Sequence, residues 1–315
     1  MRGWGRLYRT SVGLGARYLL RHGYLREAVI RIVVPLDPSR YLELPETMHE
    51  LAARPGERVL DLASPKLLAV ALARSGAEIV SVDQLETEIE SWRKLTADEP
   101  RLRLEVADGR ALPFENDFFD GAYSISVLEH IPEPGDEEAL REVARVTKPG
   151  RIVVVTLPYA AEYREDWRGA PVYADQGETD AGHFFQRWYD EARVERLAAA
   201  VPALELVSSS VSRLQPNLNE AYTRTFPLLV PLGPLFGLLA RRLEGPGGDV
   251  ARLTFRKRAE GDATVRSGGF ASPCLQASAP WRWWSRRPAS RLTTPRVAAS
   301  SSGTQSRGTP TSASW

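Results

Sequence analysis

Alternating strand and helix signals between residues 48 and 157 restrict the possible folds more than any other feature of this sequence. Five short apolar segments have the composition of buried strands, and segments with helical periodicity separate most of them. The predicted strands are 58–62, 78–82, 102–106, 121–127 and 152–157, and the predicted helices are 65–75, 85–96 and 137–146. Such alternation indicates a mostly parallel sheet with helices on both faces, because each parallel connection must cross over the sheet.

Composition divides the chain into three predicted parts. Residues 1–45 carry apolar side chains at helical spacings of three and four, and we interpret them as an N-terminal helical addition. Residues 46–258 form the predicted α/β core. Residues 259–315 are rich in Ser, Thr, Arg, Pro, Gly and Trp without any period, which predicts a disordered low-complexity tail. After the fifth strand, the elements predicted within the core are a long loop at 158–185, a helix at 190–201 and strands at 204–210 and 250–257.

Charge and cysteine content exclude several functional classes. The net charge is +1, so no overall field favours nucleic acid and no nucleic-acid partner is expected. Cys274 is the only cysteine, and the four histidines include no His-Glu-x-x-His pair, so we expect neither a disulfide nor a protein-built metal site. The sequence has no secretory signal and no apolar run of about 18 residues, which favours a cytoplasmic location.

Two apolar segments leave peripheral contact with the inner face of a membrane as an alternative. The N-terminal segment interleaves its apolar residues with Arg17, Arg21, Arg26 and Arg31, a pattern typical of a helix packed on the core and also of a membrane-surface helix. Residues 226–240 are apolar but too short and too rich in proline to span a bilayer. They suit a lid over an apolar acceptor, a segment that dips into a membrane, or a buried connection.

The first predicted strand ends in Asp61 and turns directly into a helix. Ser64 suits the N-cap position and Pro65 suits the first helical turn. A helix N-terminus offers unpaired N–H groups to an anion, and Lys66 adds a positive charge there. Ala63, Ser64 and Lys66 are therefore candidates for holding the carboxylate or phosphate of a ligand. An ordinary capped strand–helix turn explains the same residues.

Acids follow the second and third strands, where ligands bind in open α/β sheets. Asp83 ends the second strand, with Gln84 beside it, and is placed to accept hydrogen bonds from ribose hydroxyls. Asp108, followed by Gly109, is placed to accept a hydrogen bond from an adenine amino group. A solvated acid at a strand end is the alternative for Asp83.

The fourth strand runs into Ser126 and then into a turn that bears Glu129 and His130. From Asp108, the sequence continues through LPFENDFFDGAYSISVLEHI to EALREVARVTKPGRIVVVTLPY. This block resembles class I S-adenosylmethionine (SAM)-dependent methyltransferases, in particular the type-11 small-molecule group. The resemblance covers about residues 55–258.

The resemblance implies a fold and a cofactor. The implied fold is a doubly wound, Rossmann-like sheet of seven mostly parallel strands with helices on both faces and an antiparallel last strand. The implied cofactor is S-adenosyl-L-methionine, whose pocket Asp61, Asp83 and Asp108 would line. The turn at 126–130 would face the methionine part of SAM and the methyl acceptor.

The first loop departs from the family pattern Asp-x-Gly-x-Gly-x-Gly. Ala63, Ser64 and Lys66 lie where small residues that tolerate a positive φ are usual, and Pro65 removes one backbone donor. Two outcomes stay open. The loop holds SAM through the helix N-terminus and Lys66, or it binds SAM weakly or not at all, which would make the chain a catalytically silent protein that binds a partner. An oxidoreductase is disfavoured, because Gly-x-Gly-x-x-Gly is absent after the first strand.

Methyl transfer from SAM needs alignment of acceptor and methyl group, and a base only where the acceptor must lose a proton. The candidates for that base are His130, His183 in the long loop, Glu129 and Tyr159, and His130 is the first of them because it follows the fourth strand. A structural helix cap is the alternative for His130, and packing of neighbouring aromatic residues is the alternative for the segment around His183. The expected acceptor is a small molecule, a lipid-linked intermediate or a glycan, since no Asn/Asp-Pro-Pro-Tyr motif follows the fourth strand.

Overall fold

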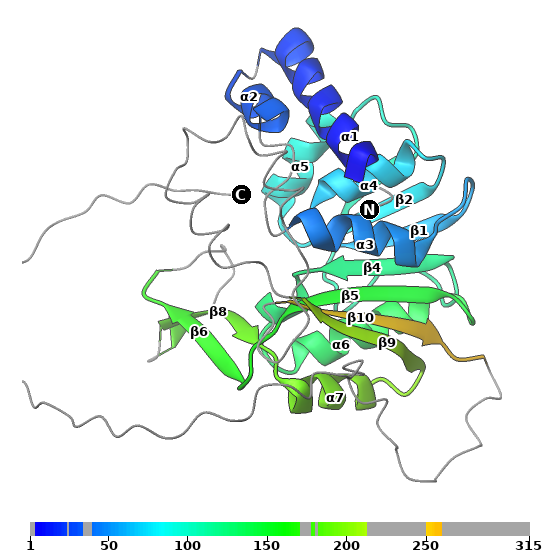
Figure 1. Cartoon of the computed structure of the whole chain (residues 1–315), viewed down its shortest axis with the longest axis vertical. Coiled ribbons are helices and arrows are strands. Elements are labelled where there is room, and N and C mark those ends of the chain that lie inside the picture. The colour runs from blue at the N-terminus through cyan, green and yellow to red at the C-terminus, as the bar shows by residue number, and fades with distance from the viewer. Residues whose placement is uncertain are drawn as a thin grey trace, which may run out of the picture. The chain divides into compact units, whose positions relative to one another are not determined.

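A seven-stranded sheet forms the centre of the molecule (Figure 1). The computed structural model describes residues 4–23, 25–33, 40–170, 178–179, 182–212 and 250–259, which all belong to one compact unit, 1–277. The strand order is β3-β2-β1-β4-β5-β10-β9. The strands are β1 Arg58–Leu62, β2 Glu78–Asp83, β3 Leu102–Val106, β4 Gly121–Ile125, β5 Ile152–Pro158, β9 Leu204–Ser212 and β10 Val250–Lys257.

The strand directions confirm the predicted fold. Strands β3, β2, β1, β4 and β5 pair in parallel, whereas β10 runs antiparallel to both β5 and β9. The chain winds outward from β1 to β3 and then returns to place β4 on the other side of β1. Ligands of open α/β sheets bind at such a reversal, outside the carboxyl ends of the strands. The candidate site is therefore expected at the ends of β1, β2 and β4.

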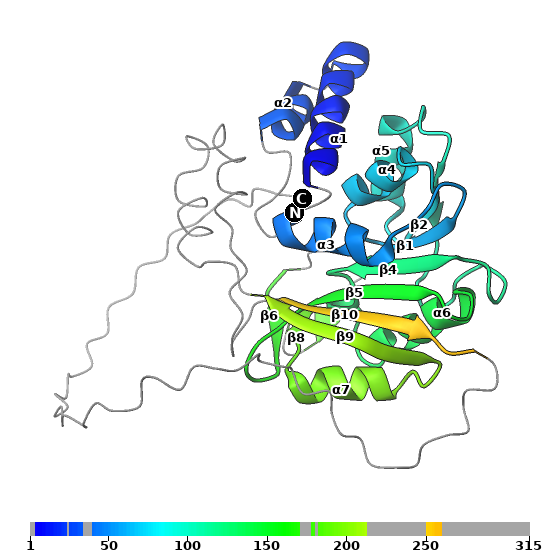
Figure 2. The same ribbon diagram turned by 45° about the vertical axis from the view of Figure 1, so that its right-hand side comes forward.

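Helices cover both faces of this sheet (Figures 1 and 2). The α-helices are α1 Trp4–Arg17, α2 Leu25–Val33, α3 Arg40–Leu51, α4 Lys66–Ala73, α5 Glu86–Leu95, α6 Gly135–Val146 and α7 Glu191–Ala199. A π-helical turn, η1 Tyr18–His22, follows α1, and a 3-10 turn, η2 Leu128–His130, follows β4.

Alternate residues of the central strands enter two separate hydrophobic clusters. Tyr123 of β4 packs in one cluster with residues of α1, α3, α4 and α5. Ala122, one position earlier, packs in the other with residues of α6 and α7. This alternation is what a sheet buried on both faces requires, since successive side chains point to opposite faces.

A second, antiparallel sheet lies where we predicted a loop at 158–185. Its order is β6-β8-β7, with bounds β6 Arg164–Arg168, β7 Glu178–Thr179 and β8 Gly182–Trp188. The loop prediction is thus wrong for these residues. The pairing of β6 with β8 shifts register between Asp166 and Trp167, and such an irregularity breaks the strict alternation that identifies a strand in a sequence.

The predicted division of the chain stays a prediction. Helix α3 spans the proposed boundary between residues 45 and 46, and Leu44 and Met48 from this helix enter the core cluster with Tyr123. Residues 226–240 and nearly all of the predicted tail lie outside the described residues. No helix among those that the structure describes combines the length and apolar character of a membrane span.

Candidate functional site

Asp61 is the second-to-last residue of β1 and is fully buried. Its Oδ1 accepts a hydrogen bond from the backbone N–H of Ser64 at 3.0 Å, and its Oδ2 accepts one from the hydroxyl of Ser81 at 2.6 Å. Burial raises the pKa of Asp61, and the nearby Lys66 and the hydrogen bonds oppose that rise. The carboxyl group therefore holds the first loop against β2.

Lys66 points inward from the start of α4, and only 2% of its side chain is exposed. Its Nζ donates to the carbonyl oxygen of Ser64 at 3.1 Å and to Oδ2 of Asp83 at 3.4 Å. The same Nζ lies 3.9 Å from Oδ2 of Asp61. The ammonium thus bridges the acids at the ends of β1 and β2. The prediction that Lys66 holds a carboxylate of the ligand stays a prediction, and in this structure its partners are the protein's own carboxylates.

Ala63 adopts the left-handed conformation that the glycine pattern would favour, with φ of 50°. The hydroxyl of Ser64 accepts a hydrogen bond from the backbone N–H of Ile125 at 2.9 Å and lies 3.2 Å from the carbonyl oxygen of Leu62. The prediction that Ser64 caps the helix is wrong, because α4 begins at Lys66, Pro65 is the N-cap residue and no side chain caps this end. The bond to Ile125 ties the first loop to the end of β4 instead.

Asp83 and Asp108 differ in burial and in their hydrogen-bond partners. Oδ1 of Asp83 accepts the backbone N–H of Leu85 at 3.0 Å and its Oδ2 receives Lys66, while Gln84 beside it is exposed. Asp108 is half-buried and forms a two-pronged ion pair with Arg110, whose hydrogen bonds lower the pKa of Asp108.

Gly109 packs directly against β1. A Cβ atom placed on Gly109 would come within 2.9 Å of Cδ1 of Leu62, so a larger residue would push the turn after β3 away from the end of β1. Gly109 therefore lies beside the end of β1, and the roles of Asp108 and Gly109 in binding the cofactor stay predictions.

Ser126 follows β4 with a φ of 52° and lies against α3. Its hydroxyl donates to Oε1 of Glu43 at 3.1 Å and accepts from Nη1 of Arg40 at 2.8 Å. Oε1 of Glu43 also accepts the hydroxyl of Thr156 at 2.8 Å, so Glu43 joins the ends of β4 and β5. Arg40 and Glu43 form an ion pair of 2.6 Å.

Sequence reasoning missed Arg40, Glu43 and Thr156 as parts of this site. Arg40 and Glu43 lie within the segment that we assigned to a helical addition, far from the strands in the sequence. One signal was present in the sequence, because Glu43 lies between two leucines. An acid that is buried in such an apolar setting needs polar partners, and Glu43 is buried.

Glu129 is buried in the turn after β4, and its Oε2 has no hydrogen-bond partner among the described residues. Burial raises the pKa of Glu129 to about 8, and the charge of nearby Glu43 adds to the rise. Glu129 is therefore largely protonated at neutral pH. A buried titratable group with an unsatisfied atom is a mark of a functional site.

His130 lies beside Glu129 and against β8. Its Nδ1 is 2.7 Å from the carbonyl oxygen of Phe185, so Nδ1 carries the hydrogen and Nε2 is the basic nitrogen of the ring. Nε2 lies 3.8 Å from Oε1 of Glu129. Burial lowers the pKa of His130, which keeps the imidazole neutral at physiological pH. His183 lies on β8 two residues before Phe185, opposite Arg168 and Glu178 in the small sheet.

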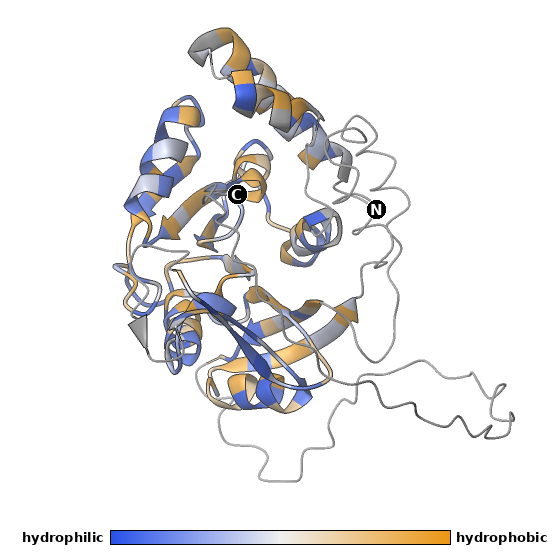
Figure 3. Cartoon of the chain, turned by 90° about the vertical axis from the view of Figure 1, so that its left-hand side faces the viewer, coloured by the Kyte–Doolittle hydropathy of each residue, from blue (hydrophilic) through white to orange (hydrophobic). Residues whose placement is uncertain are grey.

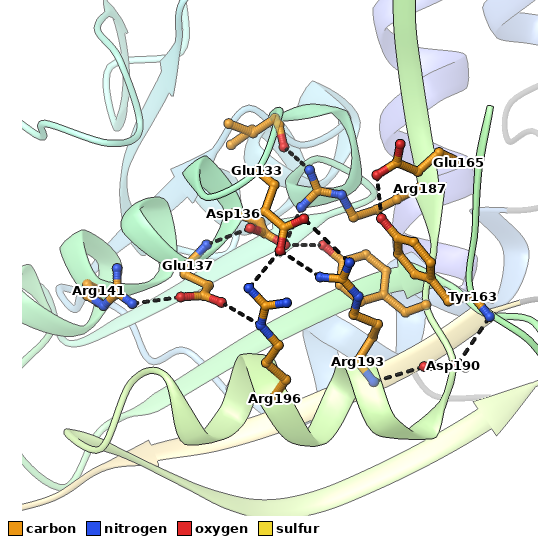
Figure 4. Close-up of polar contacts among 12 residues, drawn as sticks. Glu133, Asp136, Glu137, Arg141, Tyr163, Glu165, Arg187, Asp190, Arg193 and Arg196 are labelled. Carbon is orange, nitrogen blue, oxygen red and sulfur yellow. Dashed lines mark hydrogen bonds and ion pairs between the residues drawn. The ribbon is translucent and has the colours of Figure 1, made fainter. Parts of the chain in front are cut away.

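An ionic network holds β8 in place beside His130 (Figure 4). Arg187 of β8 is fully buried, pairs with Asp136 at 2.5 Å and donates to the carbonyl oxygen of Ile131 at 2.8 Å. The hydroxyl of Tyr189 donates to the same Asp136 at 2.8 Å. Because Ile131 directly follows His130, the network fixes the strand that supplies the carbonyl partner of the imidazole.

Residues 60–155 match the family model described as a methyltransferase domain. Two demethylmenaquinone methyltransferases align with part of the chain. The one from Clavibacter sepedonicus is 37% identical over 35% of this chain and 44% of its own length, and the one from Mycobacterium marinum is 37% identical over 42% and 58%. The chain thus spans about half the length of these curated relatives.

Solved structures add a likeness of lower identity. A 1,6-didemethyltoxoflavin-N1-methyltransferase from Burkholderia thailandensis, solved with its substrate and S-adenosylhomocysteine, is 17% identical, with a TM-score of 0.48 over 78% of this chain and 88% of that chain. The family match covers residues 60–155, from β1 into β5, and shows that this segment is similar to a methyltransferase domain.

Proposed function

We propose that this chain is a SAM-dependent methyltransferase that moves a methyl group to a small-molecule, lipid-linked or glycan acceptor. One observation carries the proposal. Within the segment that matches the methyltransferase domain, the turn after β4 presents a neutral imidazole whose Nδ1 is fixed by a backbone carbonyl. The tautomer directs the basic Nε2 of His130 to any proton that the acceptor must lose.

Several residues fit the cofactor. Ala63 keeps the left-handed turn of a glycine-rich loop, Asp83 lies at the end of β2, and Gly109 packs closely against the end of β1. We infer that Ala63, Ser64, Asp83, Asp108 and the turn at Ser126 surround SAM, with Asp83 accepting from the ribose. When bound, SAM supplies a methyl group that is already activated for transfer.

The chain's own residues then orient the acceptor and manage its proton. His130 accepts a proton from the acceptor at Nε2 while Phe185 holds the other ring nitrogen. Such general-base catalysis typically contributes about 10²–10⁴-fold to a rate. Glu129, protonated beside it, avoids a second buried negative charge next to Glu43.

The relatives' names favour a lipid-linked quinone as the acceptor to test first, since two of them are demethylmenaquinone methyltransferases. Incubation of the full chain with demethylmenaquinone and SAM carrying a labelled methyl group is expected to label the lipid. The variant His130→Asn should lose most of that transfer. If the chain binds SAM but labels neither demethylmenaquinone nor any component of a small-molecule and lipid extract, the proposed activity is wrong.

One observation favours a second candidate, a catalytically silent protein with this fold. Lys66 already pairs with Asp61 and Asp83, the two acids that would otherwise receive the ligand. This candidate predicts no binding of SAM by a folded chain. The enzyme hypothesis predicts binding, with Asp83 using a second lone pair for the ribose.

A further inference from the structure

The α1–η1–α2 hairpin exposes an apolar tip that the proposed activity does not use. Leu20 is 83% exposed and Leu25 is 62% exposed, and about half of the surfaces of Leu19 and Val29 are exposed as well. Leu25 and Val29 are four residues apart on α2, so they share one face of that helix. Among the described residues, the other exposed large apolar side chains lie singly at Val106, Trp167 and Val207.

The opposite face of the hairpin is firmly packed. Ala28 of α2 is buried with Leu14 and Tyr18 of the preceding turns, in the same cluster as α4. A Cβ atom on Gly15 would lie 2.8 Å from the carbonyl oxygen of Ala28, so the two helices are in close contact. The exposed leucines therefore lie on an element that is packed against the core. Figures 1 and 2 show α1 and α2 side by side.

The hairpin carries many more basic than acidic residues. Residues 4–33 contain six arginines and one acid, Glu27, whereas the whole chain has a net charge of +1. Several of these arginines are engaged internally, since Arg6 donates to the hydroxyl of Ser75, Arg17 pairs with Asp98 and Glu99, and Arg31 lies over the ring of Trp92. Arg26 is exposed directly beside Leu25. Figure 3 shows hydrophobic and hydrophilic residues mixed along these helices.

We propose that the tip of this hairpin, formed by Leu19, Leu20, Leu25, Arg26 and Val29, binds an anionic lipid surface. Exposed aliphatic side chains enter the boundary between head groups and acyl chains, and the excess of arginine over acid favours negatively charged lipids. Because both contributions are present in one element, binding depends on apolar contact and on charge. The inference stands apart from methyl transfer and needs no acceptor or cofactor.

Sedimentation of the full chain with vesicles tests this proposal. We expect binding to vesicles of phosphatidylcholine mixed with phosphatidylglycerol, much weaker binding to pure phosphatidylcholine, and release at high salt. The double variant Leu20→Asp, Leu25→Asp should lower the binding constant at least about tenfold, because two apolar contacts are lost and two negative charges are added. Arg26→Gln should lower it about fivefold.

Val207→Asp is the matched control, since Val207 is also an exposed aliphatic residue but lies on β9. It should bind the vesicles as the wild type does, and circular dichroism checks that every variant is folded. Three results would overturn the proposal. They are equal or absent binding to both kinds of vesicle, unchanged binding by the double leucine variant, and a concentration-dependent dimer that this variant disrupts.

Discussion

Buried charges at the ends of β1 and β2 are paired with one another, whereas those at the end of β4 are only partly satisfied. Nζ of Lys66 lies within 4 Å of both Asp61 and Asp83, and backbone and hydroxyl groups complete the hydrogen bonds of these acids. At the end of β4, Glu129 is buried with an oxygen that has no partner among the described residues, and its pKa is raised to about 8.

This difference indicates a structural role for the charges at the ends of β1 and β2 and a catalytic role for the groups at the end of β4. A closed network of charges fixes a loop. It contributes to stability chiefly because removal of one charged partner leaves another charge buried and unpaired. A protonated, partly unsatisfied acid beside a neutral imidazole is instead suited to handle protons. We therefore expect changes at the first loop to affect folding and cofactor affinity, and changes at the β4 turn to affect catalysis and the pH dependence of stability.

The largest expected effect is at His130. His130→Asn removes the basic nitrogen and should lower kcat by about 10²–10⁴-fold for an acceptor that must lose a proton, while affinity for S-adenosylhomocysteine stays within about twofold. Exposed His49 on α3 provides the control His49→Asn, which should leave kcat unchanged. Full activity of the His130 variant would show that the turn after β4 supplies no catalytic base.

In the wild type, kcat/KM should rise as pH increases through the lowered pKa of His130, because only the neutral imidazole accepts a proton. The midpoint is expected below 6.5, the ordinary value for this group. A profile measured with a saturating methyl donor checks this. A midpoint above 6.5 would mean that another group limits the rate.

The next effect is on stability at the first loop. Lys66→Met leaves two buried acids without their cation and should lower the free energy of unfolding by about 3–5 kcal/mol in urea denaturation. The exposed Lys94 on α5 provides the control Lys94→Met, with an expected change below about 0.5 kcal/mol. A Lys66 variant as stable as the wild type would show that the network is not closed in solution.

A smaller effect is expected at Glu129, with a defined sign. Its pKa is about 8 in the folded chain and near the ordinary 4.5 when unfolded, so the folded state binds the proton more tightly. Stability should therefore fall as pH rises from about 4.5 to about 8. Glu129→Gln removes this dependence and should be the more stable form above that range.

Glu133 provides the opposite sign as a control. Ion pairs with Arg193 and Arg196 accompany a lowered pKa of this exposed acid, for which the hydrogen bond from Arg193 is the main cause. Its contribution is present at neutral pH and is lost on acidification, so Glu133→Gln should be slightly less stable than the wild type at neutral pH. Equal pH profiles for the two variants would contradict the assignment of Glu129.

The smallest effect is expected in cofactor affinity at Asp83. Asp83→Asn keeps an oxygen for the backbone N–H of Leu85 but weakens the acceptor for ribose hydroxyls, so binding of S-adenosylhomocysteine should weaken several-fold. Exposed Glu86 at the start of α5 gives the control Glu86→Gln. Unchanged affinity in a folded Asp83 variant would exclude this acid from the site.

Local patterns were sufficient to predict the sheet and much of the candidate site. Strand periodicity placed Asp61, Asp83, Asp108 and Ser126 at the ends of successive strands, because parallel strands end at one edge of the sheet. Helix α7 was likewise predicted closely, and Asp190 caps it by accepting the N–H of Arg193.

Contacts between distant segments could not be predicted in this way. Glu43 meets Ser126 across 83 positions and Phe185 meets His130 across 55, and no local period encodes either pair. The direction of the Lys66 side chain at the start of α4 also depends on Asp83, which lies at the end of β2. Ser64 satisfied the rules for a helix cap but bonds Ile125, because tertiary contact overrides a local preference.

Calorimetric titration of the intact chain with S-adenosylhomocysteine tests the central claim most directly, since it needs no knowledge of the acceptor. The account predicts saturable binding at one site, with a dissociation constant well below about 1 mM, and weaker binding by Asp83→Asn. A chain that is folded by circular dichroism but releases no heat of binding at millimolar ligand would contradict the claim. The ends of β1 and β2 would then be a closed structural network without a cofactor.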